Sequence, residues 1–179
     1  VEQMLALPES RHAAILELHA DSNSDLDSAM HVCRPDTVVA IHPELFDADS
    51  PASSISSCRE LHAALPDGGS LIVGPASHTM ARGLNRDSTI TFGRGGACEI
   101  SPTNVLCTGE ELTFAVDGQV VRLNTVGRHF LDNALAAWAV GRAMGISERN
   151  IAERLASVRW PARRCKVAQA GAITFVDDT

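Results

Sequence analysis

Two polar residues, His129 and Asn133, have the types and the spacing that could serve ligand binding. The segment GRHFLDNALAA predicts the start of an Ala-rich helix, and a separation of four places both side chains on one face. An imidazole and an amide can both donate and accept hydrogen bonds, so the pair could contact an adenine base. The structural alternative is a histidine that caps the helix beside a buried asparagine.

Other candidate residues stand near the ends of predicted strands. Glu17 lies at the end of the strand Ala14 to Leu18, and His42 follows the next strand, in AIHPELF. Ligands of α/β sheets bind at the carboxyl ends of strands, and a hard cation such as Mg²⁺ takes oxygen ligands. Arg163, in PARRC, offers the planar fork of donors that suits phosphate. The structural alternatives are a solvated carboxylate for Glu17, a structural histidine for His42 and a surface arginine for Arg163.

Strands and helices alternate along the first part of the chain, and this alternation must position those side chains. The apolar spacing predicts helices from Asp25 to Val32 and from Ser53 to Leu65. The strand VVAI follows the first helix, and a strand from Ser70 to Val73 follows the second. We therefore expect an α/β fold with three layers and a mostly parallel sheet.

Residues 88 to 124 predict a small antiparallel β insert in that sheet. Short β-rich pieces such as STITFG, ELTFAV and QVVRLN follow one another, and Asp117-Gly118 between the last two is a strong hairpin signal. Downstream, LDNALAAWAVGRAMGI predicts a helix that closes at Gly145, and Ser147 is the expected N-cap of the next helix. GAITFVDD predicts one more strand.

Composition narrows the class of protein. A length of 179 residues with 45% hydrophobic content suits one domain, over 1–179. The formal charge is -7 and Lys166 is the only lysine, so we expect no nucleic-acid partner. No apolar run approaches the roughly 18 to 20 residues that cross a bilayer, so we expect no membrane span and a cytoplasmic location. Five cysteines without a C-x-x-C pair argue against a zinc site or a disulfide framework.

Several pieces, taken in order, resemble the central domain of the Mur ligases over nearly the whole chain. They are ILELHADSNSDLDSAMHVCRPDTVVAI, RELHAALPDGGSLIV, TITFG, GRHFLDNALAAWAVGRAMGI and PARRCKVAQAGAITFVDDT. The resemblance implies a P-loop NTPase-like domain. Within the family, the chain looks most like the branch that adds D-alanyl-D-alanine to UDP-N-acetylmuramoyl-tripeptide, with the diaminopimelate- or lysine-adding branch second.

The resemblance implies an ATP-dependent amide ligase of peptidoglycan precursor synthesis. Such an enzyme activates the carboxylate of a UDP-N-acetylmuramoyl-peptide as an acyl phosphate, which the amine of an amino acid or of D-Ala-D-Ala displaces. Charge accumulates on phosphoryl oxygens, so ATP, Mg²⁺ and cationic side chains must meet there. The implied partners are these two substrates and the N- and C-terminal domains of the same protein.

The same resemblance assigns roles to the candidate residues. Glu17 matches the magnesium-binding glutamate of the family, and His42 stands for a second magnesium-linked residue. Arg163 matches an arginine that reaches the ATP phosphates and is the implied catalytic residue.

The implied nucleotide contacts lie further along the chain. His129 and Asn133 face the adenine, and Asp178, or its neighbour Asp177, hydrogen-bonds the ribose hydroxyls.

Several positions depart from the family pattern. The Gly-rich loop ending in Gly-Lys-Ser/Thr normally lies upstream of Val1, and Lys166 follows no such loop. The family's carbamylated lysine falls at Cys58, or at Arg59 with a shift of one, and neither can carry a carbamate. Three further family positions are also substituted, by Phe130, Ala162 and Cys165. We therefore expect this chain alone to be inactive, and two alternatives stay open: a non-catalytic Mur-like binding or scaffold domain, and a folylpolyglutamate-type ligase.

Overall fold

A three-stranded parallel sheet forms one half of the molecule. The computed structural model describes residues 13–17, 23–42, 51–75, 89–94, 97–109, 111–125, 127–159, 166–170 and 173–177. Within them, strands β1 (Thr37–Ile41), β2 (Ser70–Gly74) and β3 (Thr89–Thr91) pair in this order, and all run parallel.

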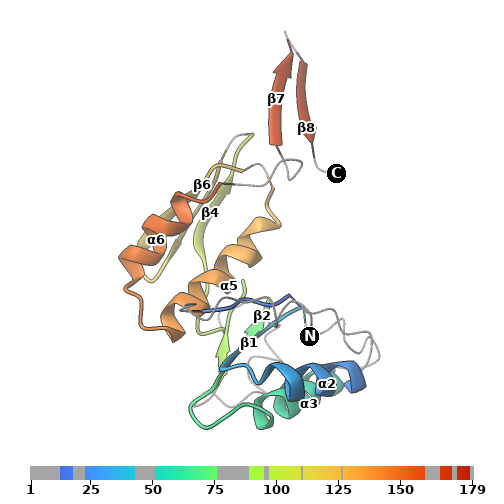
Figure 1. Ribbon diagram of the computed structural model, residues 1–179. Helices are drawn as coiled ribbons and strands as arrows, with labels where there is room; N and C mark the ends of the chain where they lie inside the picture. Colours follow the sequence, from blue (N-terminus) through green and yellow to red (C-terminus); the bar gives the residue numbers. More distant parts are fainter. Residues whose placement is uncertain are drawn as a thin grey trace.

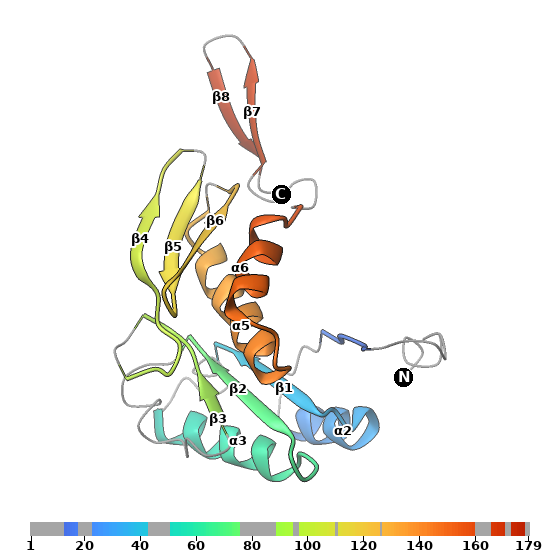
Figure 2. The same cartoon turned by 90° about the vertical axis from the view of Figure 1, so that its left-hand side faces the viewer.

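Helices cover both faces of this sheet. Helices α2 (Asn23–Cys33) and α3 (Pro51–Ala63) lie on one side, and α5 (Phe130–Ala143) lies on the other (Figures 1 and 2). The three layers follow from the alternation of helix and strand, because each helix returns the chain to the start of a parallel neighbour. The predicted α/β fold with a parallel sheet is confirmed.

Strand β2 is buried on both faces, as the middle strand of three layers must be. Leu71 and Val73 join an apolar cluster with Cys58 of α3. Ile72, which points to the opposite face, joins a larger cluster that contains Trp138 of α5. Successive residues of one short strand therefore hold the two helical layers together.

A separate antiparallel sheet forms the predicted insert. Strands β4 (Thr103–Cys107), β5 (Leu112–Val116) and β6 (Gln119–Leu123) pair in sequence order. Asp117 and Gly118 connect β5 to β6 with φ angles of 49° and 77°. Positive φ at both central residues is the requirement of the tight hairpin turn that Asp-Gly favours, so the hairpin prediction is confirmed.

Strand β3 was expected in the antiparallel insert and lies in the parallel sheet instead. Its register pairs Leu71 with Thr89 and Val73 with Thr91. Gly74 ends β2, and a Cβ added to it would stand 2.3 Å from the carbonyl oxygen of Phe92, which follows β3. The backbones of the two strands therefore approach each other closely at this end. Periodicity identifies a short strand, but it does not identify the partner of that strand.

The two helices after the insert end and begin at the predicted residues. Gly145 follows α5 with a φ of 72°, a conformation that glycine adopts at no steric cost. Ser147 precedes α6 (Glu148–Ala156), and its Oγ accepts a 3.4 Å hydrogen bond from the backbone N–H of Asn150.

Helices α5 and α6 pack against each other at a glycine. A Cβ added to Gly141 would stand 2.8 Å from two side-chain carbons of Ile151. Helix α6 also packs on β6, and Ile151, Ala152 and Leu155 face this core. The C-terminal half of α5 is therefore enclosed by α6 and the antiparallel sheet.

One predicted strand does not form in residues 13–17, and another forms but has a partner that was not predicted. Residues 13–17 have no regular secondary structure, although a strand was expected from Ala14 to Leu18. The expected final strand is β8 (Ile173–Asp177), and it pairs antiparallel with β7 (Lys166–Ala170) as a hairpin beyond α6 (Figure 1). Strand β7 was not predicted, because KVAQA has a weak alternation. None of the helices in the described ranges has the length and apolarity to cross a membrane.

Candidate functional site

The first turn of α5 carries the predicted pair of polar side chains. His129 is the N-cap residue, its side chain forms no capping hydrogen bond, and its ring centroid lies 4.3 Å from that of Phe130. His129 and Asn133 are both exposed, one turn apart. The alternative of a capping histidine beside a buried asparagine is therefore wrong, and both side chains reach the surface.

A tight turn at Gly127 sets the position of His129. A Cβ added to Gly127 would stand 2.6 Å from Cε1 of His129 and 2.8 Å from Cδ2 of Phe130. The backbone N–H of Phe130 donates to the carbonyl of Gly127 at 3.1 Å, and the N–H of Gly127 donates to Oγ1 of the buried Thr125 at 3.3 Å. Only a glycine leaves room for the imidazole to fold over this turn.

A further acidic residue, Asp132, lies in the same turn and was not singled out from the sequence. Its Oδ2 stands 3.8 Å from the guanidinium of Arg94, which follows β3. Its Oδ1 is buried and has no hydrogen-bond partner. A buried carboxylate oxygen without a hydrogen bond destabilises the fold. The helix dipole favours a carboxylate in the first turn of a helix, and this offsets part of the loss.

Two of the substituted family positions, Cys58 and Phe130, are buried, whereas Ala162 and Cys165 lie outside the described residues. Phe130 follows His129 and packs in the core with 7% of its surface exposed. Cys58 lies on α3 with 1% exposed, whereas its neighbour Arg59 is exposed. Neither Cys58 nor Arg59 has a primary amine for a carbamate, and an aromatic ring at 130 offers no amide, so these departures stand in the structure.

The two predicted magnesium residues lie on other segments. Glu17 is exposed in the irregular segment 13–17. His42 is exposed directly after β1 with a φ of 54°, and its backbone N–H donates to the carbonyl of Gly74 at 2.8 Å. Arg163 and Asp178 lie outside the described residues, and Asp177 ends β8. The structure thus places His129 and Asn133 one turn apart on α5, and the ligand roles of all six site residues stay predictions.

The implied ligands fit these residues to different degrees. An exposed imidazole and an exposed amide on one helix face can match the donors and acceptors of an adenine edge, so the base of ATP fits. For Mg²⁺, the carboxylate of Glu17 is a suitable ligand and the nitrogen of His42 is a poorer one. In the described part of the chain, no group of three or more His, Cys, Asp or Glu residues could hold a metal ion.

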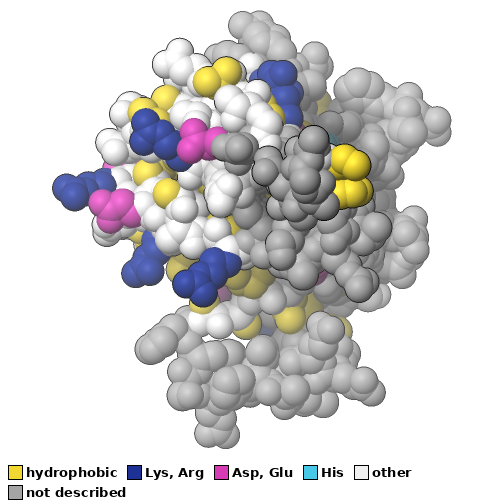
Figure 3. Space-filling model, turned by 90° about the horizontal axis from the view of Figure 1, so that it is seen from above, with side chains coloured by type: hydrophobic (Ala, Val, Ile, Leu, Met, Phe, Trp, Pro, Cys, Tyr) yellow, Lys and Arg dark blue, Asp and Glu magenta, His cyan; other side chains and the backbone are white. Residues whose placement is uncertain are grey.

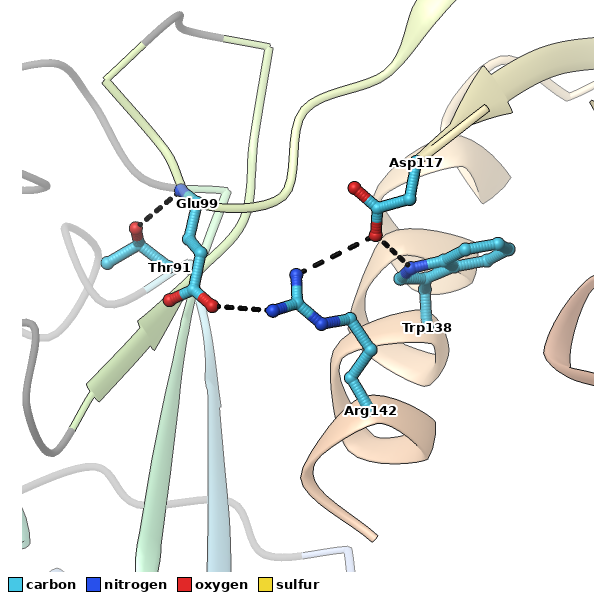
Figure 4. A network of polar contacts seen from close by, with 5 residues as sticks. All are labelled: Thr91, Glu99, Asp117, Trp138 and Arg142. Carbon is cyan, nitrogen blue, oxygen red and sulfur yellow. Dashed lines mark hydrogen bonds and ion pairs between the residues drawn. The ribbon is translucent and has the colours of Figure 1, made fainter. Parts of the chain in front are cut away.

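A second polar cluster, at the other end of α5, was also not predicted. Figure 4 shows Arg142 between two carboxylates: its guanidinium lies 2.8 Å from Oε1 of Glu99 and 3.7 Å from Oδ2 of Asp117. Asp117 also accepts a 3.1 Å hydrogen bond from Nε1 of Trp138, which is fully buried. Only the placing of Trp138 and Arg142 on one helix at i, i+4 could have suggested it.

The surface carries both signs of charge. Figure 3 shows Arg and acidic side chains interspersed over the described part of one face. On α6, for example, Arg149 and Glu153 form an exposed ion pair of 2.9 Å.

Comparison with other sequences identifies relatives for most of the chain. It is 27% identical over 181 aligned residues to the UDP-N-acetylmuramate–L-alanine ligase of Streptomyces coelicolor, an alignment that covers 90% of this chain and 37% of that protein. No family model matches the chain. The chain therefore spans a little over a third of the length of this relative.

Comparison of the fold identifies a related set of proteins. MurF from Acinetobacter baumannii superposes with a TM-score of 0.79 at 22% identity, over 99% of this chain and 41% of that one. MurF from Thermotoga maritima in complex with ADP has a TM-score of 0.67 at 16% identity, over 89% of this chain and 39% of that one.

These likenesses show an α/β fold similar to that of Mur ligase structures. The resemblance to the central domain of this family is confirmed, in sequence over most of the chain and in fold over nearly all of it. The sequence relative is named an L-alanine ligase, whereas one of the structures with a similar fold, from Acinetobacter baumannii, is named a D-alanyl-D-alanyl ligase.

Proposed function

We propose that this chain is the ATP-binding central domain of an amide ligase of peptidoglycan precursor synthesis. The likeness to an L-alanine ligase over 90% of the chain gives the class. The observation that carries the proposal is the exposed His129–Asn133 pair, which the Gly127 turn holds at the start of α5. The substrates would be a UDP-N-acetylmuramoyl-peptide and an amino acid or D-Ala-D-Ala, in the cytoplasm.

The residues of this chain would divide the work of binding ATP. His129 and Asn133 would hold the adenine by hydrogen bonds to its edge, and Asp178 would accept from the ribose hydroxyls. Arg163 would hold the phosphates with its fork of donors, and Glu17, with His42, would hold Mg²⁺. When bound, ATP would supply the phosphoryl group that activates the substrate carboxylate. The remaining parts of the site would come from other domains of the same protein.

Nucleotide binding by the intact protein that contains this chain tests the proposal. Titration with ADP, followed by calorimetry, should show binding that H129A and N133A each weaken about tenfold, the effect of losing roughly 1.4 kcal/mol. The matched control is N150A, which changes an exposed asparagine on α6. Phosphate release that depends on a muramoyl substrate and an amine would establish the ligase reaction, and a protein that binds no adenine nucleotide would refute it.

The burial of Cys58 and Phe130 favours a second candidate, a divergent Mur-like domain that binds without catalysing. Both side chains are part of the apolar core, so neither can move out to serve a ligand without a loss of packing. This function predicts nucleotide binding without phosphate release for any muramoyl or folate acceptor. The same two assays therefore separate it from the ligase.

A further inference from the structure

Arg142 joins three elements that are distant in the sequence. It lies in the last turn of α5 and contacts Glu99, in the segment after β3, and Asp117, in the turn between β5 and β6 (Figure 4). The side chain of Arg142 is 29% exposed, and those of Glu99 and Asp117 are 35% and 36% exposed. Its planar fork reaches both partners at once, which a lysine ammonium could not do equally well.

Both partners of Arg142 are themselves held in place. The backbone N–H of Glu99 donates to Oγ1 of the buried Thr91 at 3.2 Å, so Glu99 is fixed to the end of β3. Asp117 is fixed by its hairpin turn and by the indole N–H of Trp138. Arg142 therefore connects α5 to two fixed points, one bonded to the end of β3 and one in the turn between β5 and β6.

The segment after β3 contacts α5 a second time, near the start of the helix. Arg94 stands 3.8 Å from Asp132, and the bridge between Phe92 and Ile100 closes the segment at its base. Asp132 and Arg142 are separated by ten positions, or about 15 Å along the helix axis. One segment thus presents a cation to Asp132 in the first turn and an anion to Arg142 in the last turn. The two charges on the helix itself, an acid at its start and a base at its end, are the ones that the helix dipole favours.

We propose that Arg142 is a positioning residue, which fixes α5 along its axis and thereby places His129 and Asn133. A movement of Arg142 away from either carboxylate would lengthen that contact. The contact between Arg94 and Asp132, at 3.8 Å, lacks a hydrogen bond such as the one that Arg142 donates to Glu99 at 2.8 Å. The role in nucleotide binding rests on the proposed function, whereas the control of the position of α5 does not.

Amide hydrogen exchange of the chain tests the positional part. R142M removes the charge and keeps much of the side-chain length, and we expect the amides of residues 130 to 135 to exchange at least tenfold faster relative to those of β2. R149M is the matched control, because Arg149 forms an exposed pair with Glu153 within α6, and it should change neither rate. Faster exchange that is confined to residues around 142, or is equal throughout the chain, would overturn the proposal.

A second measurement connects this effect to the ligand. In the intact protein, R142M should weaken ADP binding about tenfold, R142K should weaken it less, and R142M should have no further effect when H129A and N133A are already present. Additive effects in that combination would show that Arg142 does not act through the pair. If the wild-type protein binds no ADP, the proposed function fails, while the exchange result still decides whether Arg142 positions the helix.

Discussion

The two ends of α5 differ in how far their polar side chains are exposed. At the C-terminal end, Trp138 and Arg142 share Asp117, and Glu99 completes the cluster. At the N-terminal end, His129 and Asn133 are exposed, and Oδ1 of Asp132 has no partner. A helix that is anchored at one end can present side chains at the other without paying the full entropic cost when a ligand arrives. Three substitutions test this contrast, and a fourth, on α6, serves as a reference away from both ends.

Trp138→Ala should have the largest effect, because the indole is fully buried and donates to Asp117. Truncation of a buried Trp leaves a cavity, so we expect a loss of about 3–5 kcal/mol in the free energy of unfolding. Urea denaturation measures it. Trp138→Phe keeps most of the apolar surface and should cost clearly less, and equal losses for both variants would contradict the role given to packing.

Asp117→Asn should have the next largest effect. Asparagine tolerates the positive φ of the turn, so the hairpin should survive, but the charge that meets Arg142 is lost. We expect a loss of about 1–3 kcal/mol from the weakened charge-assisted hydrogen bond, in the same denaturation assay. An unchanged stability would show that the cluster at this end of α5 does not anchor the helix.

Asp132→Asn should change stability by less than about 1 kcal/mol, because its ion pair is long and the Arg94 side chain is 48% exposed. Removal of a buried charge whose Oδ1 has no partner also offsets the loss. Urea denaturation of Asp132→Asn and Asp117→Asn under the same conditions compares the losses in the free energy of unfolding at the two ends of α5. A loss that exceeds that of Asp117→Asn would reverse it.

Glu153→Gln should have the smallest effect. Glu153 raises the pKa of Arg149, first by a hydrogen bond and then by its charge, but the arginine is fully exposed. A group whose pKa is raised in the folded state stabilises that state at pH values below its ordinary pKa, and the effect is lost only at higher pH. The titration of Arg149 therefore gives no pH dependence of stability near neutrality. Thermal melting of both proteins at neutral pH should coincide, and a clear difference would mean that α6 depends on this pair.

Local patterns predicted most of the elements of the fold. Asp117-Gly118, Gly145 and Ser147 act through the conformation of one or two residues, so their effect can be read directly from the sequence. The partner of β3 and the pairing of β7 with β8 depend on contacts between segments, and no period in the sequence encodes those.

The candidate site divides in the same way. The spacing of His129 and Asn133 was enough to place them on one face, because both belong to one helix. The cluster of Glu99, Asp117 and Arg142 was not predicted, since its members come from three elements and have no common motif. The irregular backbone around Glu17 was likewise hidden, because an apolar run predicts a strand whether or not a neighbour is available to pair with it.

The contact between Gly141 and Ile151 makes two positions of the chain interdependent. Any side chain at 141 needs volume that only a shorter residue at 151 would leave, since a Cβ would stand 2.8 Å from the isoleucine. A larger residue at 141 alone would force the helices apart, and a shorter residue at 151 alone would leave a cavity. The two changes together could keep the total side-chain volume at the contact. The close packing of α5 on α6 thus depends on two residues ten positions apart, and a substitution at one of them calls for a compensating substitution at the other.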